Sequence, residues 1–238
     1  MSLSFYAKEP QESYDLLSKA KKNDRVFGTF LSLIGVLSII FTVLPILIWN
    51  IKFGPLSESN IGQAPVPQGF VLGQNAANDI QVLKDADGFS YFATGYKPSG
   101  NRPTNFNISI PKLRIKSATV SVDTLAFYNS LSHFPGSALP GEVGNVFITG
   151  HSVLPQFTDT SNYRTIFSKL PDLEIGDTID VDLDGKNYQY IVQYKKIVDP
   201  KDLSVLAPIS KNAKNLTLMT CVPPGTSLKR MVIISSLI

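Results

Sequence analysis

Residues 215–237 read NLTLMTCVPPGTSLKRMVIISSL, a pattern on which the fold of the chain depends. The runs Asn215–Cys221 and Arg230–Leu237 are both typical of β-strands. The Pro-Pro-Gly between them ends the first run, because proline cannot donate a hydrogen bond within a sheet. The two runs are therefore predicted to form a hairpin, which would place Cys221 beside Arg230 although they lie nine positions apart.

Further strand-type runs precede this hairpin. They are Phe106–Ile110, Leu113–Val122, Asn145–Thr149, Thr178–Leu183 and Tyr188–Val198. Asp184-Gly185, between two of them, is a hairpin turn signal. Seven or eight short strands within 105–238 predict an all-β domain, a closed barrel or a sandwich. A short helix is also predicted around Tyr163–Leu170.

Three reactive side chains are expected at strand ends of this domain. His151 follows the strand-type run NVFITG, as Cys221 ends its own. A cation near Cys221 would favour its thiolate, and His151 would hold or deliver the proton that a leaving amine needs. Arg230 cannot act as a base, so its expected role is to bind an oxyanion or the substrate backbone. The competing interpretation of Cys221 is a small buried hydrophobic residue.

The composition excludes several kinds of site. A single cysteine allows neither an internal disulfide nor a multi-cysteine metal site, and two histidines exclude a histidine-rich metal centre. The net charge of +3, without a basic cluster interleaved with aromatics, argues against nucleic acid. We therefore expect no metal and no cofactor. Asp85–Gly88 (DADG) lacks the downstream glutamate of a calcium loop and is interpreted as a turn.

Residues 26–49 contain no charged side chain and are predicted to form a transmembrane helix. Lys19, Lys21, Lys22 and Arg25 precede it, and only Lys52 follows closely. By the positive-inside rule, residues 1–25 stay in the cytoplasm, and the rest of the chain lies outside a cell membrane crossed once. The apolar run exceeds the length usual for a cleaved signal peptide, so an uncleaved signal anchor is the preferred interpretation.

Residues 50–104 are predicted to be an extracytoplasmic linker or stalk. From residue 54 onward this segment is rich in Gly, Pro, Ser, Asn and Gln. One hypothesis is that its patch Phe89–Tyr96 covers the site as a lid.

Three motifs in residues 105–238 resemble the sortases, a family of cysteine transpeptidases. TLMTC at 217–221, followed by Arg230, resembles the cysteine motif of that family. HFPGSALPG at 133–141 and GNVFITGH at 144–151 resemble the stretch that leads to its histidine. IPKL at 110–113 resembles its first-strand signature. The resemblance implies a closed eight-stranded sortase-type barrel, with one or two short helices, after the membrane anchor.

The resemblance also implies a reaction without a cofactor. Cys221 would attack the Thr–Gly bond of an LPxTG-like sorting signal and form a thioacyl enzyme. An amine from a cell-wall precursor or a pilin lysine would resolve this intermediate. Thr220 would help to hold the substrate or Arg230, unless its hydroxyl faces the core, and His133 is interpreted as structural or groove-lining.

The segment Asp199–Lys214 corresponds in the family to the loop that recognises the sorting signal. Six of its residues are expected to form an apolar wall for the Leu-Pro part of the signal, unless they serve ordinary loop packing; they are Leu203, Val205, Leu206, Ala207, Pro208 and Ile209.

The chain departs from the family in ways that bear on its role. Ser152 follows the histidine where many relatives have arginine. An Asp-Pro-aromatic lid motif and a second apolar span, both usual in pilus-type members, are not found in this sequence. This favours anchoring of surface proteins to the cell wall over pilin polymerisation. A catalytically silent peptide-binding scaffold is an alternative, but the presence of Cys221, His151 and Arg230 together argues against it. A hydrolase that passes the cleaved signal to water shares the thioacyl step, so the sequence does not separate it from a transpeptidase.

Overall fold

The computed structural model describes residues 11–53, 80–84 and 90–238. The chain divides into two compact units, Met1–Ile48 and Trp49–Ile238. The predicted turn at Asp85–Gly88 lies outside the described residues.

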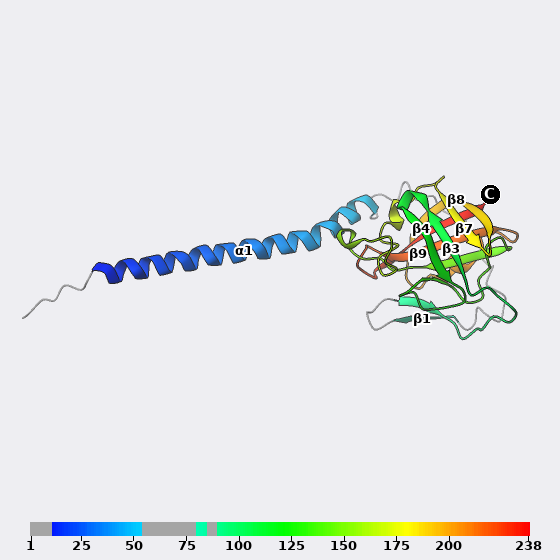
Figure 1. Cartoon of the computed structure of the whole chain (residues 1–238), viewed down its shortest axis with the longest axis horizontal. Helices are drawn as coiled ribbons and strands as arrows, with labels where there is room; N and C mark the ends of the chain where they lie inside the picture. Colours follow the sequence, from blue (N-terminus) through cyan, green and yellow to red (C-terminus); the bar gives the residue numbers. More distant parts are fainter. Residues whose placement is uncertain (1–10, 54–79, 85–89) are drawn as a thin grey trace, which may run out of the picture. The chain divides into compact units, whose positions relative to one another are not determined.

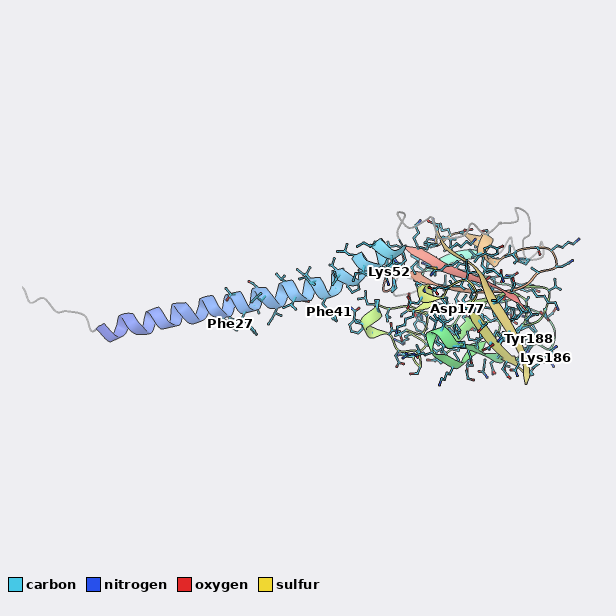
Figure 2. All side chains as sticks on the ribbon, turned by 90° about the horizontal axis from the view of Figure 1, so that it is seen from above. Phe27, Phe41, Lys52, Asp177, Lys186 and Tyr188 are labelled. Atoms are coloured by element: carbon cyan, nitrogen blue, oxygen red, sulfur yellow. The ribbon has the colours of Figure 1, made fainter. Side chains whose placement is uncertain are left out.

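The long helix α1, Gln11–Phe53, forms the described part of the N-terminal unit, and its last five residues belong to the second unit (Figure 1). Its segment Phe27–Lys52 has a mean hydropathy of 2.7 over 26 residues, and none of its most apolar window is buried. Figure 2 labels Phe27, Phe41 and Lys52 along this helix. At about 1.5 Å per residue the segment is longer than the roughly 30 Å of a bilayer's hydrocarbon core. The helix is therefore long and apolar enough to anchor the chain in a membrane.

Eight strands of the second unit close into a barrel, as predicted. Around the barrel the order is β10-β8-β7-β3-β4-β5-β6-β9. The strands are β3 (Asn105–Ile110), β4 (Ile115–Ser121), β5 (Leu131–His133), β6 (Gly144–Thr149), β7 (Thr178–Leu183), β8 (Lys186–Val198), β9 (Lys214–Val222) and β10 (Lys229–Leu237). Short 3-10 helices connect some of them: η2 (Pro111–Leu113), η3 (Pro155–Phe157), η4 (Leu170–Asp172) and η5 (Leu203–Leu206).

The predictions of barrel strands agree with the structure to within about two residues, with one barrel strand missed. β4 begins at Ile115 instead of Leu113, because η2 and the left-handed Arg114 (φ 59°) precede it. β5 is only three residues long and carried no recognisable pattern. Asp184 and Gly185 both have positive φ, as expected for a tight hairpin turn between β7 and β8.

The helix predicted around Tyr163–Leu170 is wrong. This segment forms consecutive turns, and only Leu170–Asp172 is helical, as the 3-10 helix η4. The backbone N–H of Phe167 donates to the carbonyl of His151 (3.0 Å), which removes one bond that an α-helix would need. Ile166 and Phe167 are nevertheless fully buried. The spacing of apolar residues is typical of a helix, but the hydrogen bond between Phe167 and His151, which follows β6, holds the segment in another conformation.

Two apolar layers lie on opposite faces of the barrel wall. Side chains alternate between the two faces along each strand. On β9, Leu216, Leu218 and Val222 belong to the large interior core, whereas Met219 belongs to a second cluster. We call this second cluster the outer layer; its buried members are Phe92, Phe134, Phe147, Val205, Leu206, Met219, Val232 and Ile234. The outer layer covers the wall formed by β6, β9 and β10.

Part of the predicted linker is ordered. β1 (Gln81–Lys84) and β2 (Ser90–Ala93) pair as an antiparallel hairpin. Phe92 of this hairpin is buried in the outer layer, with its ring centroid 6.1 Å from that of Phe147. The hairpin therefore packs against the barrel.

Candidate active site

Strand β9 places the predicted cysteine between the other two predicted residues. β9 pairs with β10 in antiparallel fashion, and Cys221 lies directly opposite Arg230. On its other side β9 runs parallel to β6, with Thr149 opposite Met219. Because the two strands run in parallel, moving two residues farther toward the C-terminus on each of them brings His151 to the level of Cys221. Residues directly opposite one another in a sheet point to the same face, so the three side chains converge.

All three side chains line one pocket on the outer face of the barrel wall. Cys221 is half-buried, whereas the exposed fractions of His151 and Arg230 are 8% and 1%. Most of the remaining lining is apolar or aromatic and includes Tyr91, Phe92, Leu125, Phe127, Phe134, Phe147 and Met219. The pocket thus combines one thiol, one imidazole and one guanidinium with an apolar wall.

Backbone contacts on two sides fix the position of His151. Its carbonyl accepts from the N–H of Phe167, and the N–H of Gly150 donates to the carbonyl of Met219 (3.2 Å). A Cβ on Gly150 would lie 2.6 Å from Leu131 and 2.7 Å from Phe167, so a side chain has no room there. The absence of a side chain at Gly150 therefore allows the end of β6 to lie close to Leu131 and Phe167.

Thr220 contributes to the same junction. Its hydroxyl is buried and donates to the carbonyl oxygen of Gly150 over 2.8 Å. Neither interpretation made from sequence included this bond to the protein's own backbone, and Thr220 also belongs to the pocket lining. Thr220 connects the strand that carries Cys221 to the strand that carries His151.

Two aromatic rings that the sequence did not indicate flank the imidazole. The ring centroids of Phe127 and Tyr128 lie 4.3 and 5.0 Å from that of His151. Tyr91 of β2 makes an edge contact with Phe127, at 6.3 Å between centroids. The Arg164 guanidinium lies 5.2 Å from the centre of the Tyr128 ring. Both rings belong to the loop between β4 and β5, so this loop helps to orient His151.

The guanidinium of Arg230 is held by its own turn. Its Nη1 donates to the carbonyl oxygens of Ser227 (3.1 Å) and Lys229 (2.9 Å). These two bonds hold the planar guanidinium, which carries five N–H donors, beside Cys221. A thiolate at Cys221 would gain from this fixed positive charge, and so would an oxyanion formed beside it.

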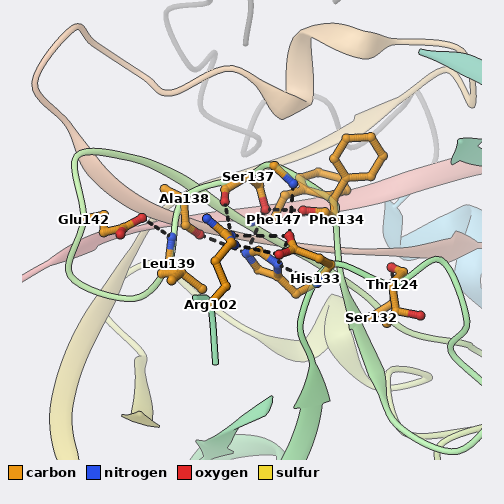
Figure 3. A network of polar contacts seen from close by, with 12 residues as sticks. Arg102, Thr124, Ser132, His133, Phe134, Ser137, Ala138, Leu139, Glu142 and Phe147 are labelled. Atoms are coloured by element: carbon orange, nitrogen blue, oxygen red, sulfur yellow. Dashed lines mark hydrogen bonds and ion pairs between the residues drawn. The ribbon is translucent and has the colours of Figure 1, made fainter. Parts of the chain in front are cut away.

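His133 belongs to a separate buried network, shown in Figure 3. Its Nε2 lies 2.9 Å from both Ser137 Oγ and the carbonyl oxygen of Ala138, and its Nδ1 lies 3.6 Å from an Asp123 carboxylate oxygen. Arg102 bonds the other Asp123 oxygen at 2.6 Å and the Ser137 carbonyl at 2.9 Å. His133 is fully buried and does not line the pocket. This placement agrees with the structural interpretation of His133.

Asp123 begins the loop that carries the two aromatic rings. Burial raises the pKa of this carboxyl, but the His133 ring, the Gly136 N–H and Arg102 outweigh that effect and hold the pKa below its usual value. Asp123 also adopts a left-handed backbone (φ 51°), which is unfavourable for a residue other than glycine. Its three partners therefore hold the start of the loop in a strained conformation.

The predicted apolar wall is not part of the pocket lining. Leu206 is buried in the outer layer, whereas Ala207 and Pro208 are half-buried and lie outside the lining.

Among the described residues, no group of three or more His, Cys, Asp or Glu side chains could hold a metal ion.

The family model for the sortase domain matches residues 108–238, more than half of the chain and the whole of the barrel after the start of β3. The chain belongs to the sortase family. The sortases are a family of transpeptidases.

Relatives of this sortase include members of several subclasses. Sortase D of Bacillus subtilis is 26% identical over 142 residues, which are 58% of this chain and 65% of that protein, so the match spans less than two thirds of its length. The crystal structure of sortase C1 from Streptococcus agalactiae matches with a TM-score of 0.50 at 31% identity, covering 59% of this chain and 70% of that one. A sortase D5 transpeptidase from Clostridium perfringens matches with a TM-score of 0.48 at 25% identity, covering 57% and 79%.

Proposed function

We propose that this sortase is a cysteine transpeptidase that cleaves an LPxTG-like sorting signal between Thr and Gly and joins the new carboxyl end to an amine. The observation that carries the proposal is the position of Cys221, with Arg230 directly opposite on β10 and His151 beside it after β6, all lining one pocket. Membership of the family supports the same reaction class.

In the first half-reaction, the Cys221 thiolate attacks the carbonyl carbon of the substrate threonine. The C–N bond to glycine breaks, and the leaving amine takes a proton from His151. Arg230 donates hydrogen bonds to the oxyanion or to the substrate backbone. The products are a thioester on Cys221 and a released peptide that begins with glycine.

In the second half-reaction, an incoming amine attacks the thioester carbon. It gives up a proton to His151 and forms an amide, while the thiolate of Cys221 leaves. The amine would come from a cell-wall precursor, which makes surface-protein anchoring the proposed role. The helix α1 would hold the enzyme in the cell membrane, with residues 1–25 in the cytoplasm and the barrel outside, because the basic residues precede the span.

Intact-mass spectrometry of the full chain in detergent tests the proposal. The chain is mixed with an LPxTG peptide, with and without an oligoglycine amine or a lysine-bearing pilin peptide, and Cys221→Ala is the control. We expect a thioacyl adduct on the wild-type chain and a ligated product that depends on the amine. Ligation to the pilin peptide alone would replace anchoring by polymerisation, and peptide hydrolysis without ligation would replace transfer by hydrolysis. A folded chain without adduct across a library of sorting signals would overturn the proposal.

A further inference from the structure

One buried side chain on the outer face of the barrel wall uses its full hydrogen-bonding capacity. Asn145, near the start of β6, is 3% exposed. Its Nδ2 donates to the carbonyl oxygens of Val205 (3.0 Å) and Leu206 (3.2 Å). Its Oδ1 accepts from Asn215 Nδ2 (2.6 Å) and Thr217 Oγ1 (2.8 Å). An amide offers two donors and two acceptor sites, so all four are occupied.

These bonds attach the loop between β8 and β9 to the barrel. The loop carries η5 (Leu203–Leu206), which is four residues long. Asn215 adds a second attachment, because its Oδ1 accepts from the N–H of Ile209 (3.3 Å). Two asparagine side chains of the wall thus bind the loop backbone on both sides of residues 207–208. A short 3-10 turn has little stability of its own, so these buried bonds set the position of the loop.

The same loop packs behind the wall of the pocket. Val205 and Leu206 are buried in the outer layer together with Phe147 and Met219, and the latter two line the pocket. A displaced loop would therefore change the apolar surface that a bound peptide meets.

The spacing along β6 matches the length of the proposed substrate. Asn145, Phe147 and His151 are at odd positions of the same strand and its extension, and so point to the same face. At about 3.3 Å per residue, Phe147 lies roughly 13 Å from the level of His151, and Asn145 roughly 20 Å. The four residues LPxT, extended from Cys221, also span about 13 Å. The Leu-Pro end of the substrate would thus reach the layer of Phe147, where the loop packs.

We propose that Asn145 is a positioning residue for substrate recognition, which holds the β8–β9 loop behind the apolar wall that Phe147 and Met219 present to the start of the sorting signal. The inference rests on the proposed function. Asn145 does not touch the reacting atoms; it acts through the loop.

The test compares Asn145→Asp with Thr217→Val in the full chain in detergent. The aspartate keeps the size of the side chain but replaces the two donors to Val205 and Leu206 with an acceptor. The valine removes a bond to the same Asn145 oxygen and leaves the loop bonds in place. For an LPxTG peptide, we expect Asn145→Asp to raise KM about tenfold with kcat near the wild-type value, because two buried hydrogen bonds are lost. Thr217→Val should leave KM near wild type.

A second peptide, with alanine in place of Leu and Pro, measures discrimination. The wild-type chain should prefer the LPxTG peptide, and Asn145→Asp should lose most of that preference. Hydrogen exchange of residues 199–213 should be faster in Asn145→Asp than in Thr217→Val. Should Asn145→Asp not fold, Asn145→Ser replaces it, because one hydroxyl cannot donate to both carbonyls.

The outcomes separate the two proposals. No turnover by the folded wild-type chain would mean that the proposed function fails. Wild-type turnover combined with an unchanged KM and unchanged discrimination in the Asn145 variant would overturn the role of Asn145 alone. Equal effects of the Asn145 and Thr217 variants on KM would also overturn it, because they would reflect a general loss of stability.

Discussion

The hydroxyl of Ser152 donates a hydrogen bond to the carbonyl oxygen of Cys221 over 2.7 Å. The residue that follows the histidine thus holds the backbone of the cysteine, although the two lie 69 positions apart in the chain. Ser152 is buried, with an exposed fraction of 3%. The position at which many sortases carry arginine is used here to fix the distance between the ends of two strands.

The first prediction concerns this bond. Ser152→Ala should slow acylation of Cys221 by about tenfold, because the nucleophile loses one support of its backbone. The measurement is the rate of adduct formation by intact mass. Ser235→Ala is the matched control, since Ser235 is equally buried and donates to another β9 carbonyl, that of Leu216 (2.8 Å). Equal rates in the two variants would contradict a specific role for Ser152.

The second prediction concerns the guanidinium of Arg230. Arg230→Lys keeps the charge but loses the planar set of donors, so kcat should fall by about 10² or more. Single-turnover acylation measures the effect. Lys229→Ala serves as the control, because the exposed pair of Lys229 with Asp199 (3.6 Å) contributes little. Near-normal acylation in Arg230→Lys would show that charge alone suffices.

The third prediction concerns the rings beside His151. The double variant Phe127→Leu/Tyr128→Leu should lower kcat about tenfold, with a smaller change in KM, because the imidazole loses the surfaces that orient it. Steady-state kinetics with the LPxTG peptide gives both parameters. Phe157→Leu, at an aromatic that is 60% exposed, is the control. An unchanged kcat in the double variant would show that the strand contacts alone orient His151.

The fourth prediction is a pH dependence of stability. The partners of Asp123 hold its pKa below its usual value, so its contribution to stability is present above about pH 4 and is lost as the pH falls through the lowered pKa. Asp123→Asn should therefore lower the Tm by several degrees at pH 7, and by progressively less as the pH falls below about 4. Thermal unfolding of both proteins across this range measures the difference. A difference in Tm that does not change with pH would contradict the prediction.

The fifth prediction tests the lid hypothesis. Phe92 of the β1–β2 hairpin packs on Phe147 within the pocket lining. Phe92→Ala should open this surface and speed both alkylation of Cys221 by iodoacetamide and acylation by peptide. Because Cys221 is the sole cysteine, alkylation reports on this site alone. Unchanged rates would exclude the lid. Deletion of residues 54–104 is a poorer test, because it also removes Arg102, the partner of Asp123.

Most barrel strands could be predicted from sequence because alternation and turn residues are local signals. Cys221 and Arg230 followed from one hairpin, whose register depends on residues nearby in the chain. The link from His151 to Cys221 depends on parallel pairing of β6 with β9, a long-range contact that the spacing of residues does not encode. The sequence predicted that both residues lie at strand ends of one domain, but the register that brings them together is seen only in the structure.

The features that sequence reasoning missed are all defined by tertiary contacts. Phe127 and Tyr128 lie in a loop with no periodic pattern, and their role becomes visible only beside His151. The segment Tyr163–Leu170 has helical spacing, but the bond from Phe167 to His151 decides its shape. Asn145 reads as an ordinary strand residue until the loop it binds is in place.

The site occupies the outer side of the wall formed by β6, β9 and β10, while the inner side of the same strands fills the barrel. Consecutive residues of one strand therefore carry two separate tasks, one for cohesion and one for chemistry. For protein engineering, this means that neighbouring residues of one strand can be chosen to change different properties of the enzyme. Substitutions at interior positions such as Leu218 and Ile233 would act on the packing of the barrel, whereas substitutions at outward positions such as Phe147 and Met219 would act on the pocket lining as well as on the outer layer.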